Sequence, residues 1–432
     1  MNSLSKKDHK IKGNLKFNFE GGDLSSDSGL IILYKFIDAI DLDELIDDNL
    51  DFTIKEVKKF KQRILTASAG YHEDTVLKDL KNDPLLTKLL DREHLFSQAT
   101  MSRYDNDLDE KDLKNFEQLN LELLKRSYEI NEPAKVILDI DSTGIKTFGK
   151  QEDQAFNGHY KEVGFHPLML FDGITGDLIK SELRPGNVYT SNGVCDFLEP
   201  VLQWFDENFP NIRLIFRGDS GFAIPKLYRL LEDYDVKYAI RLKANKVLHE
   251  NSIQVKDLSE SHLKININKE TIIYDHIEYK ANSWEKHRNV EIKVERKADR
   301  LDFRKTFIVT NMKKTTKAII DFYAGRGEME NFIKEAKNGF DMKHMSHSNY
   351  LTNKNKMAQL VIIYNLNNLM KRLTFPKKER KYTIKTIRNK FFKIASRCTK
   401  GAGYFTYKLA TSYPYKEIFY EILSNIKAIP AV

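Results

Sequence analysis

The sequence predicts an α/β protein whose central sheet is interrupted by a β-rich insertion and flanked by helical regions. Three observations support this class. The hydrophobic period changes from helical to alternating at Pro133, strands and helices then follow one another up to residue 245, and strands without intervening helices continue to residue 313. The chain has 432 residues, 41% of them hydrophobic, which is enough for two or three folded domains.

The first 130 residues are expected to be a helical DNA-binding region. Apolar residues recur at helical spacing in segments 29–46, 53–71 and 110–130. Residues 95–107 fit a short loop followed by a helix start. Their 97–103 portion could contact DNA or could be an ordinary capped turn.

The central segment, residues 131–245, begins with a strand and continues as a mixed α/β unit. Ile137, Asp139 and Asp141 lie on one face of that first strand, because successive side chains in a strand alternate. A glycine-bounded turn then predicts a β-hairpin. The elements expected in order are a strand over 134–146, a hairpin over 165–187, a helix over 192–209, a strand over 212–219, a helix over 223–235 and a strand over 236–245.

The remaining segments complete this plan. Residues 246–313 alternate in hydrophobicity without a good helix and predict a β-rich insertion. Residues 314–350 return to helix and are expected to complete the central unit. Residues 351–432 predict a basic helical C-terminal region with a loop around 397–405.

The composition favours a polyanionic partner and excludes several other classes. The net charge is +8, and the basic, aromatic-rich segment 370–400 could contact a phosphate backbone or could form a solvated lysine-rich face. Cys195 and Cys398 have no metal-ligand spacing and suggest a reducing cytoplasm. No apolar run is long enough to span a bilayer, and the N-terminal segment lacks the apolar core of a signal peptide, so we expect no membrane association.

One helix carries an unusual polar stripe. At 100° per residue, Tyr323, Arg326, Glu330 and Lys337 fall within an arc of about 60°. An apolar stripe runs beside them along the same helix and consists of Met329, Ile333, Ala336 and Phe340. Charged groups at the edge of a core are expected to have a function.

Two glycines interrupt this helix. Gly325 and Gly327 each cost about 1 kcal/mol in a helix interior. They predict either that the helix begins near Arg326 or that a DNA strand approaches the backbone closely.

Three carboxylates occupy positions that the predicted order of elements would bring together. Asp141 ends the first strand, Asp219 ends the fourth, and Glu330 lies on the later helix. Strand ends at a topological switch form an open site, and carboxylate oxygens are suitable ligands for one or two Mg²⁺ ions. Local roles remain open for each residue: a turn cap for either aspartate, and a surface pair with Lys334 for Glu330. Asp139 competes with Asp141 because it shares the same face.

For the other candidates, an ordinary structural role is at least as well supported as a functional one. Lys243 and Asn245 follow a strand and could contact phosphate, or could be a solvated strand end. Trp284 could stack on an unpaired base or pack inside the β-rich insertion. His159 and His166 flank the hairpin and are expected to be structural or surface residues.

The polar stripe resembles the signature of bacterial insertion-sequence transposases, which are DDE enzymes with an RNase H-like fold. Its Tyr, Arg, Glu and Lys are separated by two, three and six residues, and the segments "LDIDSTG", "FRGDSGF" and "YAIRLKAN" resemble core blocks of that family. The resemblance implies an RNase H-like core in which Asp141, Asp219 and Glu330 bind two Mg²⁺ ions, with Mn²⁺ as a substitute. It also implies that Tyr323, Arg326 and Lys337 bind transposon-end phosphates, with Lys334 as a further candidate for DNA contact.

The function implied is cut-and-paste transposition: metal-dependent cleavage at insertion-sequence ends, then strand transfer into target DNA. The expected partners are terminal inverted repeats, target DNA and a second copy of the chain in a DNA-bound homodimer. The expected location is the bacterial cytoplasm, in association with the nucleoid. Two alternatives remain open, namely a catalytically inactive, domesticated DNA-binding protein and an RNase H-like nuclease that only hydrolyses DNA.

Overall fold

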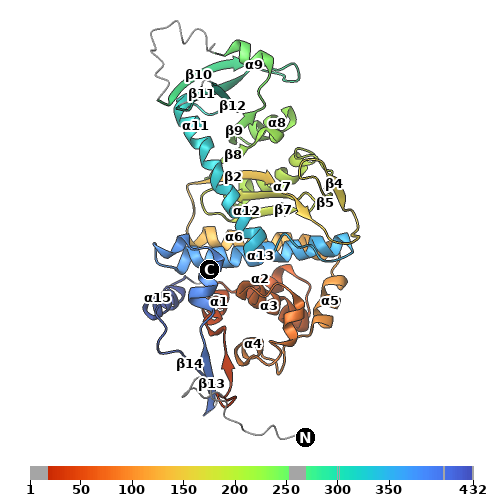
Figure 1. Cartoon of the computed structure of the whole chain (residues 1–432), viewed down its shortest axis with the longest axis vertical. Coiled ribbons are helices and arrows are strands. Elements are labelled where there is room, and N and C mark those ends of the chain that lie inside the picture. The colour runs from red at the N-terminus through yellow and green to blue at the C-terminus, as the bar shows by residue number, and fades with distance from the viewer. Residues whose placement is uncertain (1–17, 253–268, 299, 301, 402–403, 431–432) are drawn as a thin grey trace. The chain divides into compact units, whose positions relative to one another are not determined.

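A computed structural model describes residues 18–252, 269–298, 300, 302–401 and 404–430, and the chain divides into two compact units. The first unit combines residues 1–108 with residues 366–432, and the second comprises residues 109–365. No helix in the described ranges is long and apolar enough to cross a bilayer. Figure 1 shows the elements of both units.

The first unit is mainly helical, as expected for its N-terminal part. A buried ion pair joins two of its helices, because Arg63 donates to both carboxylate oxygens of Asp105 at 2.5 and 2.8 Å. The helices lying wholly within this unit are α1 (Ile31–Ala39), α2 (Leu42–Asn49), α3 (Ile54–Ala69), α4 (Pro84–Leu89), α5 (Gln98–Asp107), α14 (Ile384–Ile387) and α15 (Lys416–Lys427).

The expected loop around residues 397–405 is largely strand, which corrects the sequence prediction. Strand β13 (Ser396–Gly401) pairs antiparallel with β14 (Tyr404–Leu409) and with β1 (Leu24–Ser25). Threonine and aromatic residues are frequent in these two segments, and such side chains favour the extended backbone.

The second unit is built on one mixed eight-stranded sheet (Figure 1). Strand β2 pairs parallel with β8, and β8 pairs parallel with β9, whereas the other neighbours are antiparallel. The strands, in spatial order, are β10 (Thr271–Tyr279), β11 (Arg288–Arg296), β12 (Arg304–Thr310), β9 (Lys237–Leu242), β8 (Arg213–Gly218), β2 (Lys135–Ser142), β6 (Leu168–Asp172) and β7 (Leu178–Glu182).

Helices cover this sheet, and both the helices and the strands contribute to its core. The elements expected between residues 134 and 245 are confirmed in type and order. Side chains from α7, α8 and the central strands form a large buried cluster that includes Phe205, Phe216 and Leu231. The helices of this unit are α6 (Glu110–Ile130), α7 (Val194–Asn208), α8 (Pro225–Asp233), α9 (Lys246–Asn251), α11 (Thr316–Ala324), α12 (Met329–Gly339) and the first part of α13 (Tyr350–Thr374).

The β-rich segment lies where the sequence places it, but it continues the main sheet. Strand β12 pairs with β9 from Phe307 opposite Leu242 to Thr310 opposite Ala239. The short helix α9 at its start was not expected. Residues 253–268 of this segment lie outside the described residues. The last strand of the insertion thus leads directly back to the core, close to α11.

A second, smaller sheet follows β2 and was missing from the sequence prediction. It consists of β3 (Ile145–Lys146), β5 (Glu162–Phe165) and β4 (Ala155–Asn157), all antiparallel. Strands of two to four residues are too short to show a clear alternation of polar and apolar side chains.

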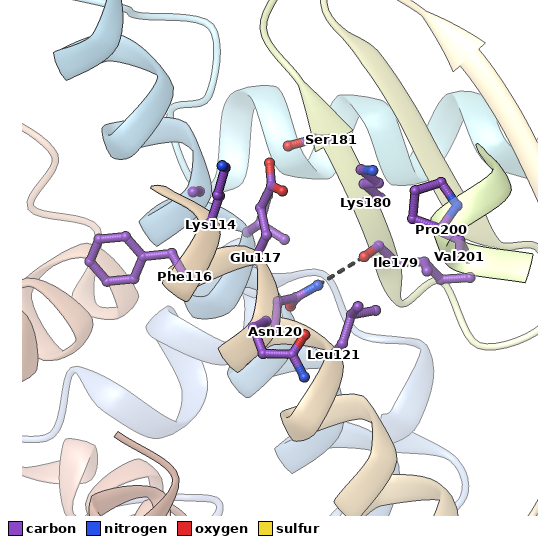
Figure 2. Close-up of a pocket in the computed structure, with 13 residues that line it drawn as sticks. Lys114, Phe116, Glu117, Asn120, Leu121, Ile179, Lys180, Ser181, Pro200 and Val201 are labelled. Atoms are coloured by element: carbon purple, nitrogen blue, oxygen red, sulfur yellow. Dashed lines mark hydrogen bonds between the residues drawn. The ribbon is translucent and has the colours of Figure 1, made fainter. Parts of the chain in front are cut away.

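The outer edge of the main sheet is partly closed by two asparagines. Asn120 donates to the carbonyl oxygens of Leu178 and Ile179 at 3.2 and 3.0 Å, the latter bond being drawn in Figure 2. Asn365 accepts from the Leu178 amide at 2.9 Å. A cavity of about 180 Å³ opens beside this edge between α6, β7 and α7 (Figure 2). None of the predicted site residues lines it.

Candidate active site

Two of the predicted carboxylates lie at the ends of neighbouring parallel strands. Asp141 is near the end of β2, and Asp219 directly follows β8 and accepts a hydrogen bond from the Gly221 amide at 2.8 Å. Burial raises the pKa of Asp141, Arg326 opposes this increase, and the nearby charge of Asp219 adds to it. The two aspartates therefore lie within electrostatic range of each other at one edge of the sheet.

Arg326 contacts this acidic pair directly. Its Nη2 lies 3.0 Å from Asp141 Oδ2 and donates to the Ile140 carbonyl oxygen at 3.3 Å. The 3₁₀ segment Gly325–Glu328, between α11 and α12, carries the arginine. Its side chain is 17% exposed, so the guanidinium is held at the end of β2 while remaining accessible to solvent.

Lys337 marks the other end of the polar stripe and also contacts the end of β2. Its Nζ donates to Thr143 Oγ1 at 3.0 Å and to the Gly144 carbonyl oxygen at 2.7 Å. Arg326 and Lys337 thus both face residues 140–144, as the helical stripe predicts.

Glu330 lies on the same helical stripe, between these two basic residues. Its side chain is 68% exposed, and its carboxylate lies 3.9 Å from Lys334 Nζ, which is the surface pairing that the sequence left open. Three residues separate it from Arg326 and six from Lys337, so within α12 it lies on the same side as Lys337. The carboxylate is solvated and has no strong partner that a ligand would need to displace.

The residues of this edge partly fit a divalent metal. Asp141 and Asp219 offer the hard oxygen ligands that Mg²⁺ prefers. Across the part of the chain that the structure describes, no three or more His, Cys, Asp or Glu side chains are arranged to hold a metal ion. The structure thus brings the two aspartates together, whereas the role of Glu330 as a third metal ligand stays a prediction.

The apolar stripe beside the polar one is buried, as the sequence predicts. Met329, Ile333, Ala336 and Phe340 are buried. Tyr323 packs partly against a second cluster that contains Ile319 and Ile320. Burial raises the pKa of Tyr323, and the charges that affect it include Arg326, Asp219 and Asp141. The tyrosine is thus at the margin of the core and also within range of the acidic pair.

Asp139, the competitor of Asp141, is enclosed in an ion pair. Arg217 donates to its two carboxylate oxygens at 2.6 and 2.5 Å, and Asp139 is fully buried. A carboxylate enclosed in this way is not open to a metal. Arg217 is not among the predicted site residues, although an arginine directly after the apolar run "LIF" in β8 indicates a buried acidic partner.

The two glycines have different surroundings. A Cβ on Gly325 would lie 2.8 Å from Arg217 Nη1, whereas a Cβ on Gly327 would meet no heavy atom within 4 Å. Helix α12, which carries Glu330 and Lys337, begins at Met329 after the 3₁₀ segment Gly325–Glu328, so the expected helix start near Arg326 is confirmed to within a few residues. At Gly325 the close approach is made by Arg217, a residue of the protein itself.

The remaining candidates have local structural roles. Asn245 caps α9 by accepting from the Leu248 amide at 2.8 Å, and Lys243 is exposed. Trp284 is 5% exposed and packs against Tyr228 with ring centroids 5.3 Å apart. Packing is therefore its role, and an enclosed ring cannot stack on an unpaired base.

Comparison of the whole sequence with protein families gives a result consistent with this geometry, that is, with the mixed sheet, the aspartates at the strand ends and the adjacent Arg326. The family model described as transposase DDE domain group 1 matches residues 7–431. The chain therefore belongs to this transposase family. No curated protein matches it.

Solved structures of transposases show a distant similarity. The piggyBac transposase synaptic complex with hairpin DNA aligns with a TM-score of 0.43 and 12% identity, over 85% of this chain and 80% of that chain. The catalytic domain of Mos1 mariner transposase aligns with a TM-score of 0.20 and 15% identity, over 33% of this chain and 66% of that chain.

Proposed function

We propose that this chain is a DDE transposase that cleaves DNA at the ends of an insertion sequence and joins those ends to target DNA. One observation carries the proposal. Asp141 and Asp219 lie within electrostatic range at the ends of neighbouring parallel strands, and a helix places Arg326 and Lys337 against the same strand end. Membership of the transposase family gives this arrangement its chemical context.

Asp141, Asp219 and Glu330 would hold the divalent metal, which we take to be two Mg²⁺ ions with Mn²⁺ as a substitute. Such ions activate a water or a 3′-hydroxyl and stabilise the leaving oxygen of a phosphodiester. In this proposal, Asp219 keeps its carboxylate at the strand end through the Gly221 amide. The exposed Glu330 carboxylate, which lies 3.9 Å from Lys334 Nζ, would turn toward the two aspartates from the solvent side.

The basic residues of the stripe would bind and orient the DNA backbone. Arg326 can turn part of its planar guanidinium from Asp141 to a phosphate oxygen, since it has several donors. Lys337 and Tyr323 would contact phosphates on either side. Lys334 and Lys243, which are exposed, would add weaker backbone contacts.

The five strands β7, β6, β2, β8 and β9 would constitute an RNase H-like core, with β10 to β12 as its insertion. Three antiparallel strands followed by two parallel ones are consistent with that fold. We further propose that residues 1–130 and 351–432 recognise terminal inverted repeats, that the chain acts as a homodimer on two DNA ends, and that it does so at the bacterial nucleoid.

The test is cleavage and joining of a duplex that contains the terminal repeat flanking the gene for this chain. Asp141→Ala, Asp219→Ala and Glu330→Ala should abolish Mg²⁺-dependent cleavage and leave DNA binding intact. Asp196→Ala is the matched control, because Asp196 forms an exposed pair with Lys226 at 3.6 Å. Cleavage at the wild-type rate by all three variants would refute the assignment.

Two further outcomes identify the alternatives. A wild-type protein that binds the duplex but never cleaves it would be the inactive DNA-binding protein. Pre-cut ends that are hydrolysed but never joined to a target plasmid would indicate a purely hydrolytic nuclease. Joined products support the transposase.

A further inference from the structure

The turn that follows Asp141 gathers several hydrogen-bond donors in one place. Thr143 contributes a hydroxyl and Gly144 a backbone amide, and both follow the strand that carries the aspartate. Lys337 reaches the same turn from α12 and donates to Thr143 Oγ1 and to the Gly144 carbonyl oxygen. These two acceptors are neutral oxygens, which an anionic ligand would readily replace as partners of the ammonium.

Tyr160 covers this turn from the small sheet. A Cβ on Gly144 would lie only 2.7 Å from Tyr160 Cδ2, so the ring packs directly on the glycine. Tyr160 is nevertheless 39% exposed. A tyrosine that is packed on one side and open on the other can present its hydroxyl to a ligand.

The β4–β5 turn holds Tyr160 in place. Asn157 Oδ1 accepts from the backbone amides of His159 and Tyr160 at 2.9 and 3.1 Å, and Asn157 Nδ2 donates to the Gly186 carbonyl oxygen at 2.7 Å. The His166 ring lies 5.9 Å from the Tyr160 ring, centroid to centroid. Little ordering is therefore left for a ligand to impose on this side chain.

The Tyr160 phenol is also within electrostatic range of the acidic pair. Burial raises the pKa of this phenol, and the charges of Asp141 and Asp219 raise it further. Hydrogen bonding from the Gly144 amide and from Thr143 acts in the opposite direction.

We propose that Tyr160, Thr143, the Gly144 amide and Lys337 form a phosphate-binding subsite, which holds a backbone phosphate next to the phosphodiester that reacts. The proposal deepens and rests on the proposed function, since it assumes that DNA reaches the acidic pair. It assigns Tyr160 a direct contact with substrate. It also explains why position 144 is a glycine, because any Cβ there would displace the tyrosine ring.

Tyr160→Phe tests the subsite by removing one hydroxyl and leaving the ring. The probe is the terminal-repeat duplex, with binding measured by fluorescence anisotropy at several salt concentrations in the absence of divalent metal. We expect about tenfold weaker binding, which is typical for loss of a hydrogen bond to a charged group. The salt dependence should stay unchanged for Tyr160→Phe and should fall by about one unit of slope for Lys337→Ala, because only lysine neutralises a phosphate.

A scan with single methylphosphonate substitutions locates the contact. At one phosphate next to the cleaved position, the neutral analogue should weaken wild-type binding, and Tyr160→Phe should then cause no further loss. Tyr189→Phe is the matched control, since Tyr189 is 62% exposed in the neighbouring loop and should bind like the wild type. Far-ultraviolet circular dichroism and the thermal midpoint verify that each variant is folded.

The proposal is overturned if Tyr160→Phe binds the duplex with wild-type affinity. It is also overturned if the loss of binding free energy caused by Tyr160→Phe adds in full to the loss caused by every methylphosphonate substitution. Failure of the proposed function has a different signature, namely a wild-type protein that does not cleave or join this duplex with Mg²⁺. The binding comparison between variants does not depend on that reaction.

Discussion

Arg217 and Asp139 form a two-point ion pair that connects β8 to β2 beneath the acidic edge. Arg217 Nε lies 2.6 Å from Asp139 Oδ1, and its Nη2 lies 2.5 Å from Oδ2. The same guanidinium donates through Nη1 to the Phe322 carbonyl oxygen at 2.7 Å. One buried arginine therefore ties both aspartate-bearing strands to the helix that precedes Arg326 and Glu330.

Asp139→Ala should lower the free energy of unfolding by about 3–5 kcal/mol, because it leaves the Arg217 charge buried without its partner. Chemical denaturation of the purified variant measures this loss. Asp196→Ala removes an exposed carboxylate and should change stability by less than about 1 kcal/mol. Similar small effects at both positions would mean that the buried pair does not hold the strands together.

Gly325→Ala and Gly327→Ala should have opposite effects on stability. Alanine favours helix over glycine by about 1 kcal/mol, and a Cβ at Gly327 meets no heavy atom within 4 Å. At Gly325 the added Cβ would lie 2.8 Å from Arg217 Nη1 and would displace that guanidinium. Thermal unfolding should show a higher midpoint for Gly327→Ala and a lower one for Gly325→Ala. Stabilisation by both substitutions would show that Arg217 can move at little cost.

Arg326→Ala should slow single-turnover cleavage with Mg²⁺ by at least about 100-fold, as for other charged donors aimed at a reacting group. The matched variant is Lys226→Ala, whose side chain is 67% exposed and 3.6 Å from Asp196. It should change the rate by less than about threefold. Equal losses in the two variants would indicate a general effect of positive charge and would remove the specific role of Arg326.

Asp172 should make stability depend on pH in an unusual direction. Burial raises its pKa to about 6 from the ordinary value of 3.8, although Ile174 and Thr175 donate hydrogen bonds to it. Between about pH 4 and about pH 6 the folded state then binds more protons than the unfolded state at this group. Its contribution to the free energy of unfolding therefore rises as the pH falls.

Asp172→Asn removes this titration and provides the test. The stability of the wild type relative to the variant should increase by roughly 2 kcal/mol as the pH is lowered from about 7 to about 4.5. Urea denaturation at several pH values measures the difference. Asp196→Asn is the exposed control, and a constant difference between wild type and Asp172→Asn would contradict the prediction.

The order of the core elements could be predicted because each is long enough to show its period. The helical stripe likewise predicted that Arg326 and Lys337 face the same way, and both contact residues 140–144. The short strands β3, β4 and β5 gave no such signal. As a result, the contact between Tyr160 and Gly144 could not be anticipated.

Which of two neighbouring polar residues is accessible to a ligand depends on partners that are distant in sequence. Asp139 and Asp141 share one face of β2, and only the side chain of Arg217, on the adjacent strand, distinguishes the enclosed carboxylate from the accessible one. The role of Trp284 is determined in the same way by Tyr228 from α8. Pattern within a segment predicts the element, whereas tertiary contacts decide which of its polar side chains is available.

The pairing of β12 with β9 has a consequence for attempts to shorten this protein. Removing residues 246–313 as if they were a detachable cassette would strip a neighbour from β9 and unpair the backbone of a central strand. It would also uncover Ile319 and Ile320, whose cluster includes Ile308 from the deleted part. A minimal catalytic fragment must therefore retain at least β12, or replace it with a strand of matching register.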